Sequence, residues 1–288
     1  MNIKIGSRKS ELAIKQTEAV IKKLSAYFQE DSFEIVGIST HGDKDSHTPL
    51  QSFGGKGVFV KEIESALISG EIDMAVHSAK DMPTELDDRL EISAALLRED
   101  RSDVLVYYGD TKIADIKTIG TSSARREIQS RAVFPDAVYT PIRGNIRTRL
   151  EKVKSGDYDA VIMARAALSR LNIRDVNIFE FGSDFVCAAG QGILAVETAR
   201  GKMKKYTDAI NEDNVMRELT AERAFLRGVG GGCHTPCGAS AVYKNGMLTM
   251  RVFYRDTKKS VHLEMSGSDP ALLGAEMARV ILAKTEGQ

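Results

Sequence analysis

A glycine-rich stretch, VGGGCHTPCG at residues 229–238, carries two of the three cysteines of the chain. Structural zinc needs four ligands, and the adjacent Cys233 and His234 rarely bind one ion. A redox pair more usually has the spacing CxxC. A buried, unreactive thiol is the plain interpretation of Cys187 and Cys237. Cys233 follows three glycines, so its thiol can be approached closely and its thiolate is a strong nucleophile, which makes a chemical anchor the other interpretation.

Arginines gather between residues 121 and 155, where acids are few. A solvated helix face is the ordinary explanation of such a run. Here GTSSARR lies where a strand enters a helix, so backbone N–H groups, hydroxyls and guanidinium groups can converge on one anion. IRGNIRTR repeats this arrangement, and Arg8 and Ser10 occupy the first strand–helix turn. The pattern favours a ligand with several acidic groups. The arginines are Arg125, Arg126, Arg131, Arg143, Arg147 and Arg149.

A third candidate is HSAKDMP, residues 77–83, at the end of an apolar strand. Strand ends that face a cleft often carry catalytic groups. Asp81 lies beside Lys80, so we expect it to stay ionised, and such a carboxylate can move a proton or stabilise a cation. A turn or cap residue before Pro83 is the alternative. His77 reads as a core histidine. FGGKGVF, residues 53–59, lacks the phosphate-loop spacing and is expected to be a glycine-rich loop with Lys56 as a candidate anion contact.

Alternating strands and helices must position these residues. The β–α alternation indicates parallel-rich sheets with helices on both faces, and its two blocks indicate two lobes around a cleft. After residue 213 the pattern changes to a helix, a hairpin at Asn245-Gly246, a further strand and a last helix. We therefore predict an α/β fold with a small α+β C-terminal domain. Strands are expected at 2–7, 33–40, 72–78, 116–120, 137–142, 159–164, 239–244, 247–255 and 260–266, and helices at 10–30, 58–70, 213–228 and 269–285.

Composition narrows the class of protein. The 288 residues include 40 acidic and 40 basic side chains, so no global field attracts nucleic acid or an anionic membrane. Neither a signal-peptide core nor an apolar run of membrane-spanning length is visible. The chain is therefore expected in the cytoplasm, with reduced thiols.

Nine motifs, in this order, resemble the porphobilinogen deaminase (hydroxymethylbilane synthase) family: GSRKSELA, THGD, GGKGVFVKE, AVHSAKDMP, GTSSARR, IRGNIRTRL, AAGQGILAVE, LTAERAFL and GGCHTPCG. The resemblance implies two lobes similar to type II periplasmic binding proteins, residues 1–98 with 192–210 and residues 99–191, and a third domain, residues 211–288. It implies that four porphobilinogen molecules are joined head to tail with loss of ammonia. It also implies a monomer and a dipyrromethane cofactor held as a thioether, for which Cys233 is the matching cysteine.

The same resemblance assigns roles to residues, with Asp81 as the catalytic carboxylate and no metal. The expected cofactor-binding residues are Cys233, Lys80, Asp81, Ser123, Arg125, Arg126 and Arg149. The expected substrate-binding residues are Arg8, Ser10, Thr121, Arg143, Arg149 and Arg170. The chain departs from the family pattern at Cys187, His234, Thr235 and Cys237. The main alternative function is a non-catalytic, two-lobed binding protein for an organic polyanion; a nucleic-acid module is a second one.

Overall fold

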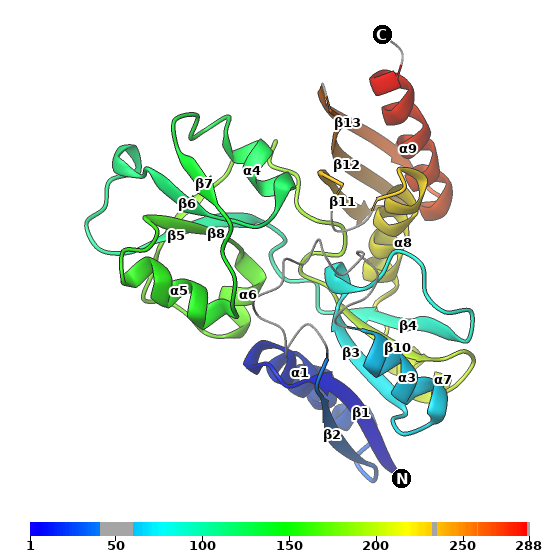
Figure 1. Cartoon of the computed structure of the whole chain (residues 1–288). Helices are drawn as coiled ribbons and strands as arrows, with labels where there is room; N and C mark the ends of the chain where they lie inside the picture. Colours follow the sequence, from blue (N-terminus) through cyan, green and yellow to red (C-terminus); the bar gives the residue numbers. More distant parts are fainter. Residues whose placement is uncertain (41–59, 232–234, 258, 287–288) are drawn as a thin grey trace.

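The computed structural model describes residues 1–40, 60–231, 235–257 and 259–286. Its strands form three sheets, two of five strands and one of three. Figure 1 shows the first sheet with its helices at the bottom, the second at the left and the third at the upper right. Among these residues no helix combines the length and the apolar character needed to cross a membrane.

Lobe 1 holds the five-stranded sheet with the order β2-β1-β3-β10-β4. β1 runs parallel to β2 and β3, whereas β10 runs antiparallel to β3 and β4. Helix α1 packs Val20 and Leu24 onto one face, and α3 packs Ile63 and Leu67 onto the other. The elements are β1 Asn2–Arg8, α1 Glu11–Tyr27, β2 Ser32–Ile38, α3 Lys61–Ser69, β3 Met74–Ser78, the 3₁₀ helix η2 Ala79–Asp81, β4 Leu90–Leu96, β10 Leu194–Ala199 and α7 Lys204–Ile210.

Lobe 2 repeats this design with the order β7-β6-β8-β5-β9. β6 is parallel to β7 and β8, and β5 is antiparallel to β8 and β9. In each lobe the antiparallel strand is the first one after the chain crosses from the other lobe, through residues 97–102 and 181–193, here called the first and second crossovers. The elements are β5 Asp103–Tyr107, η3 Ile113–Asp115, β6 Thr118–Gly120, α4 Ala124–Ser130, β7 Val138–Thr140, α5 Ile146–Lys154, β8 Ala160–Ala164, α6 Arg165–Arg170 and β9 Asn177–Glu180.

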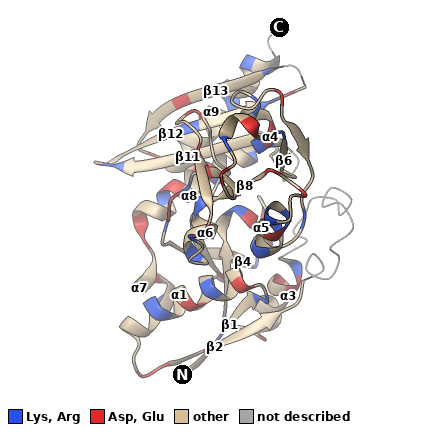
Figure 2. Cartoon of the chain, turned by 90° about the vertical axis from the view of Figure 1, so that its left-hand side faces the viewer, with Lys and Arg blue, Asp and Glu red and all other residues tan. Residues whose placement is uncertain are grey.

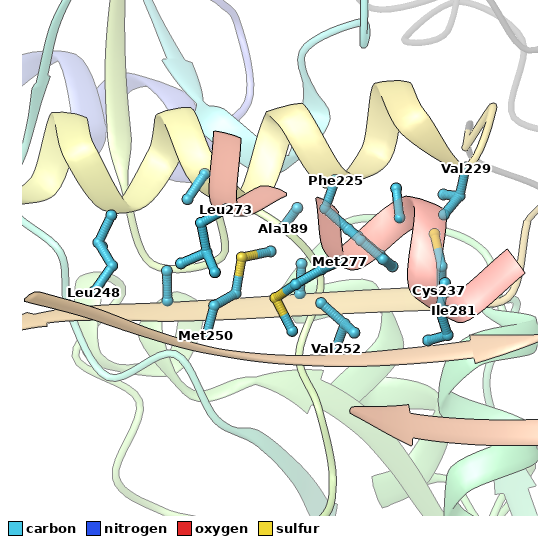
Figure 3. Packing of buried hydrophobic residues seen from close by; sticks show 14 of the residues in the cluster. Ala189, Phe225, Val229, Cys237, Leu248, Met250, Val252, Leu273, Met277 and Ile281 are labelled. Carbon is cyan, nitrogen blue, oxygen red and sulfur yellow. The ribbon is translucent and has the colours of Figure 1, made fainter. Parts of the chain in front are cut away.

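Domain 3 is an antiparallel sheet, β11-β12-β13, covered by α8 and α9. Figure 3 shows its core, where Phe225 from α8 and Met277 from α9 meet Met250 and Val252 of the sheet. The predicted hairpin is confirmed, because Asn245 and Gly246 have φ angles of +53° and +81°, as a tight two-residue turn requires. The elements are α8 Asp213–Gly228, β11 Cys237–Lys244, β12 Met247–Arg255, β13 Ser260–Gly267 and α9 Pro270–Glu286.

The predicted class, two α/β lobes and a small α+β domain, is confirmed. The expected strands and helices are present with ends shifted by a few residues, although residues 58–59 of the helix predicted at 58–70 lie outside the described residues. Gly70 ends α3 in the left-handed conformation (φ +75°). The pattern missed β9, α7 and β10, although β10 lies in the motif AAGQGILAVE. The exact domain boundaries stay a prediction.

Two buried glutamates of α8 join the crossovers to domain 3. Glu222 accepts hydrogen bonds from the backbone N–H groups of Gly190 (2.6 Å) and Ala241 (2.7 Å), and forms an ion pair with Arg98 (2.8 Å). Glu218 binds Arg98 (2.9 Å) and the N–H of Tyr243 (3.0 Å). Both crossovers and the first strand of domain 3 are therefore bonded to one helix.

Replacing Glu222 with Gln should destabilise the fold by about 3 kcal/mol, because it removes one of the two buried carboxylates that pair with Arg98 and weakens the acceptor of two backbone N–H groups. Urea unfolding measures the loss. The control is Glu276→Gln, which breaks an exposed pair with Arg279 on α9 and should cost under about 1 kcal/mol. Equal losses of unfolding free energy in the two variants would show that the buried pair stabilises the fold no more than the exposed one.

Candidate active site

A small cavity of about 50 Å³ lies where β1 and β3 end at the N-terminus of α1. Its lining includes Arg8, Ser10 and Asp81, three of the residues predicted for catalysis and substrate binding. Ser10 caps α1 by accepting a hydrogen bond from the N–H of Ala13 (3.3 Å). Asp81 ends the short helix η2 that follows β3, and its side chain is exposed. The strand-end position expected for the HSAKDMP motif is thus observed.

The turn GTSSARR forms the entry from β6 into α4 in lobe 2. Ser123 caps α4, with its hydroxyl accepting from the N–H of Arg126 (3.4 Å), and the hydroxyl of the buried Thr121 accepts from the N–H of Ser123 (3.2 Å). Because both hydroxyls are bonded within the turn, the first turn of α4 is fixed in place. Arg125 and Arg126 follow on that turn.

The turn IRGNIRTR forms the entry into α5. Gly144 has a φ of +110°, and a β-carbon there would lie 2.7 Å from Thr148, so glycine is needed. Asn145 caps the helix, and Arg149 Nε donates to the carbonyl of Gly144 (2.8 Å). Burial, with the charge of Arg126, lowers the pKa of Arg149 to about 10, and the charge of Asp81 opposes this shift. Arg149 of lobe 2 therefore lies within electrostatic reach of Asp81 of lobe 1.

Lys80 occupies the same charged environment from the lobe 1 side. Burial, with the charges of Arg126 and Arg125, lowers the pKa of Lys80 to about 8, and the charges of Asp81 and Asp103 oppose this shift. The Lys80 amine donates to Gln191 Oε1 at 3.3 Å. The structure thus brings Lys80, Asp81, Arg125, Arg126 and Arg149 together between the lobes.

Asp103, the first residue of β5, holds the two arginines of α4. Its side chain is fully buried. Arg125 Nη1 donates to Oδ2 (2.8 Å), while Arg126 Nε (2.9 Å) and Gln191 Nε2 (3.0 Å) donate to Oδ1. Burial alone would raise the pKa of Asp103, but Arg125 and Arg126 hold it well below its usual range.

The charges of this site do not cancel. Lys80, Arg125, Arg126 and Arg149 are four cations against the two carboxylates of Asp81 and Asp103, an excess of two positive charges. Burial lowers the pKa of Lys80 and of Arg149, so it disfavours their charged forms. Cations of this kind are stabilised when carboxylates or phosphates bind them. The donor set therefore fits a ligand that carries several carboxylates. In Figure 2, which faces lobe 2, basic segments are visible on α5 and α6.

Family models match almost the whole chain. Residues 3–207 match "Porphobilinogen deaminase, dipyromethane cofactor binding domain", and residues 216–283 match "Porphobilinogen deaminase, C-terminal domain". The chain belongs to the porphobilinogen deaminase family.

Curated porphobilinogen deaminases agree with these matches. The one from Lachnospira eligens is 43% identical over 98% of this chain and 99% of its own length, and that from Geobacillus kaustophilus is 42% identical over 97% and 94%. Among solved structures, the second substrate-binding domain of a putative amino acid ABC transporter from Streptococcus pneumoniae aligns with 80% of this chain and 95% of its own, at 15% identity and a TM-score of 0.44.

Membership in the porphobilinogen deaminase family confirms the predicted dipyrromethane cofactor and makes the chain an enzyme of tetrapyrrole synthesis. Two predicted contacts cannot be placed. Cys233, the predicted anchor, and Lys56 in the glycine-rich loop at 53–59 lie outside the described residues. The roles predicted for individual side chains stay predictions, supported to different degrees by their surroundings.

The two described cysteines match the buried-thiol interpretation. Cys187 and Cys237 are 3% and 8% exposed, and burial raises the pKa of each to about 11. The thiol of Cys237 lies in the core of domain 3 (Figure 3). Burial therefore disfavours the reactive thiolate form of both thiols.

Arg170 and Arg147 bond to residues outside the charged site around Asp81. Arg170 binds Glu99 (3.0 Å) and the carbonyl of Gly192 (2.6 Å), so it joins the two crossovers, and its predicted contact with substrate stays a prediction. Arg147 of α5 forms a two-pronged ion pair with Glu11 of α1 (2.6 and 2.7 Å), which bridges the lobes. Arg143 is half-buried, and it contributes to the field at Arg149.

His77 is a core histidine, as expected: it is 7% exposed, and its Nε2 lies 3.0 Å from the buried Glu197. Sequence reasoning missed Asp103 and Gln191. A weak signal existed for both, since Asp103 opens an apolar strand and Gln191 lies in AAGQGILAVE. Their significance comes from the pairing of distant segments.

A stability measurement tests the charge excess. The folded-state pKa of Lys80 is lowered from 10.5 to about 8, so its penalty is complete below pH 8 and is relieved as pH rises towards 10.5. In protein made without cofactor, Lys80→Met should therefore raise the melting temperature at pH 7, and this gain should fade between about pH 8 and 10. The control is Lys202→Met at an exposed position. A Lys80→Met variant that melts lower at pH 7 would contradict the charge excess.

Proposed function

We propose that this chain acts as a transferase that joins four porphobilinogen molecules head to tail on a covalently held dipyrromethane, and then releases linear hydroxymethylbilane by hydrolysis. The reaction consumes four porphobilinogen molecules and one water, and yields one hydroxymethylbilane and four ammonia molecules. Family membership supports the activity. The excess of partly buried positive charge around Asp81 is the observation that carries it, because every pyrrole unit brings an acetate and a propionate.

The residues around Asp103 fit the cofactor. Two pyrrole rings carry four carboxylates, and Lys80, Arg125, Arg126 and Arg149 can bind them, with Ser123 as a further donor. Each charge-assisted hydrogen bond contributes roughly 1.5–3 kcal/mol, so several are needed to hold the rings in register. When bound, dipyrromethane supplies a nucleophilic pyrrole carbon as the starting point of the chain.

Cys233 is proposed as the anchor. The other two cysteines are buried, with thiols of raised pKa, which disfavours both as nucleophiles. Cys233 also lies in the glycine-rich motif just before β11. Joining the thiol to the first porphobilinogen forms a C–S bond and breaks a C–N bond, and the thiol proton leaves with ammonia.

Asp81 is proposed to act on the substrate. Porphobilinogen that loses ammonia becomes a cation spread over its pyrrole ring, and a carboxylate near the ring N–H stabilises that charge. As a carboxylic acid, Asp81 can also protonate the departing amine. Arg8 and Ser10 line the same cavity and are proposed to bind the substrate acids, together with Thr121, Arg143, Arg149 and, at the crossovers, Arg170.

The alternative function, a non-catalytic binding protein for an organic polyanion, would use the same arginines but would need neither Asp81 nor Cys233. The relatives named above are porphobilinogen deaminases, and this chain aligns with nearly their whole length, which favours catalysis. The cytoplasmic location and the monomeric state stay predictions.

Intact mass of the denatured protein tests the anchor. Active protein should carry an adduct of two pyrrole units, and a proteolytic digest should place it on the peptide that contains Cys233. Cys233→Ser should fold, lack the adduct and have almost no activity. Cys237→Ser should keep the adduct and the activity. An unmodified wild-type mass in active protein, or an adduct on Cys237, would overturn the assignment.

Turnover of Asp81→Asn tests the catalytic role. Loss of an acid–base or cation-stabilising carboxylate should reduce kcat by roughly 10²–10⁴-fold, while the adduct stays detectable by mass. Asp88→Asn, at an exposed position seven residues further along the loop, serves as the control. If the Asp81 variant turns over at a near-normal rate, Asp81 takes no part in the chemistry.

A further inference from the structure

The buried carboxylate of Asp103 bonds to Arg125 and Arg126, two of the residues predicted to bind the cofactor. Its two oxygens receive Arg125 Nη1 at 2.8 Å, Arg126 Nε at 2.9 Å and Nη2 at 2.7 Å, and Gln191 Nε2 at 3.0 Å. These four contacts account for most of what a carboxylate can accept. Asp103 therefore serves the arginines and has little capacity left for a ligand of its own.

Each guanidinium is also fixed on a second side. Arg125 Nη1 donates to the carbonyl of Val186 (2.7 Å), and Arg126 Nη1 donates to the carbonyl of Ile162 (2.9 Å). Val186 belongs to the second crossover and Ile162 to β8. The orientation of both arginines is thus determined by the protein itself, before any acidic ligand binds.

Gln191 extends this arrangement from Asp103 of lobe 2 to Lys80 of lobe 1. Its Nε2 donates to the carbonyl of Arg101 (2.8 Å) and to Asp103, so the amide oxygen is left to face Lys80, whose Nζ lies at 3.3 Å. Gln191 is fully buried and lies on the second crossover, while Arg101 lies on the first. One amide therefore relates Lys80 of lobe 1 to the Asp103-bound arginines of lobe 2.

We propose that Asp103, together with Gln191, is a positioning residue for cofactor assembly. It orients Arg125 and Arg126 directly and Lys80 through Gln191, so that these three cations are arranged for carboxylates in advance. It also limits the charge excess, because removing its charge would raise the uncompensated excess from two to three. This inference rests on the proposed function.

The test follows cofactor assembly directly. Protein is made in cells that cannot supply porphobilinogen, porphobilinogen is then added, and the two-ring adduct is followed by intact mass. In Asp103→Asn the amide offers one acceptor fewer and turns a donor towards a guanidinium group. We expect adduct formation to slow by at least about tenfold, the size of one lost charge-assisted hydrogen bond. Loaded molecules should then show a raised KM more than a lowered kcat.

Two further variants separate positioning from general stability. Asp159→Asn is the matched control: Asp159 precedes β8 in the same sheet and accepts from the N–H groups of Lys117 (2.8 Å) and Thr118 (2.7 Å), without contacting the arginines. It should lower the melting temperature but leave the rate of adduct formation within about twofold. Gln191→Met keeps the Asp103 carboxylate and should slow the adduct about threefold, so it carries the test if Asp103→Asn does not fold.

The outcomes are distinct. Adduct formation within twofold of wild type in both Asp103→Asn and Gln191→Met would overturn the positioning role, as would equal slowing in Asp159→Asn. A wild-type chain that never forms the adduct would instead overturn the proposed function, and this inference with it.

Discussion

An excess of positive charge that is partly removed from water is the constraint on which the rest of this structure depends. Taking a cation out of water is costly unless an opposite charge accompanies it. Here two carboxylates accompany four cations. The lowered pKa values of Lys80 and Arg149 reflect the unfavourable free energy of keeping these two groups charged. A ligand with several carboxylates removes that cost, so binding and selectivity for acidic pyrroles have the same physical origin.

The architecture explains how such a site can persist in a folded chain. The two lobes share one strand pattern, and each receives its antiparallel strand from the other. Asp103 begins one of these strands, and Gln191 lies shortly before the other, so the residues that hold the cations are located on the covalent connections between the lobes. Glu218 and Glu222 bond the same connections to domain 3. The site is therefore supported by the segments that connect the two lobes and by their bonds to domain 3.

Much of this could be predicted from the sequence, because local patterns determine it. Strand–helix periodicity indicated the lobes, Ser123 and Ser10 could be recognised beside the helices that they cap, and Asn245-Gly246 specified a hairpin. The roles of Asp103 and Gln191 could not be predicted, since they follow from pairings between segments about 20 to 110 residues apart in sequence. For the same reason, the hydrogen bonds of Arg170 to the crossovers could not be predicted from the sequence of the helix around it.

The titration of the Lys80 amine, followed by NMR in cofactor-free and cofactor-loaded protein, tests the central claim most directly. If acidic groups of the cofactor neutralise the buried excess, the pKa of Lys80 should rise from about 8 in the free protein to its ordinary value of 10.5 or above on loading. A pKa that stays near 8, or falls further, in the loaded protein would contradict the account, because it would place the cofactor carboxylates elsewhere.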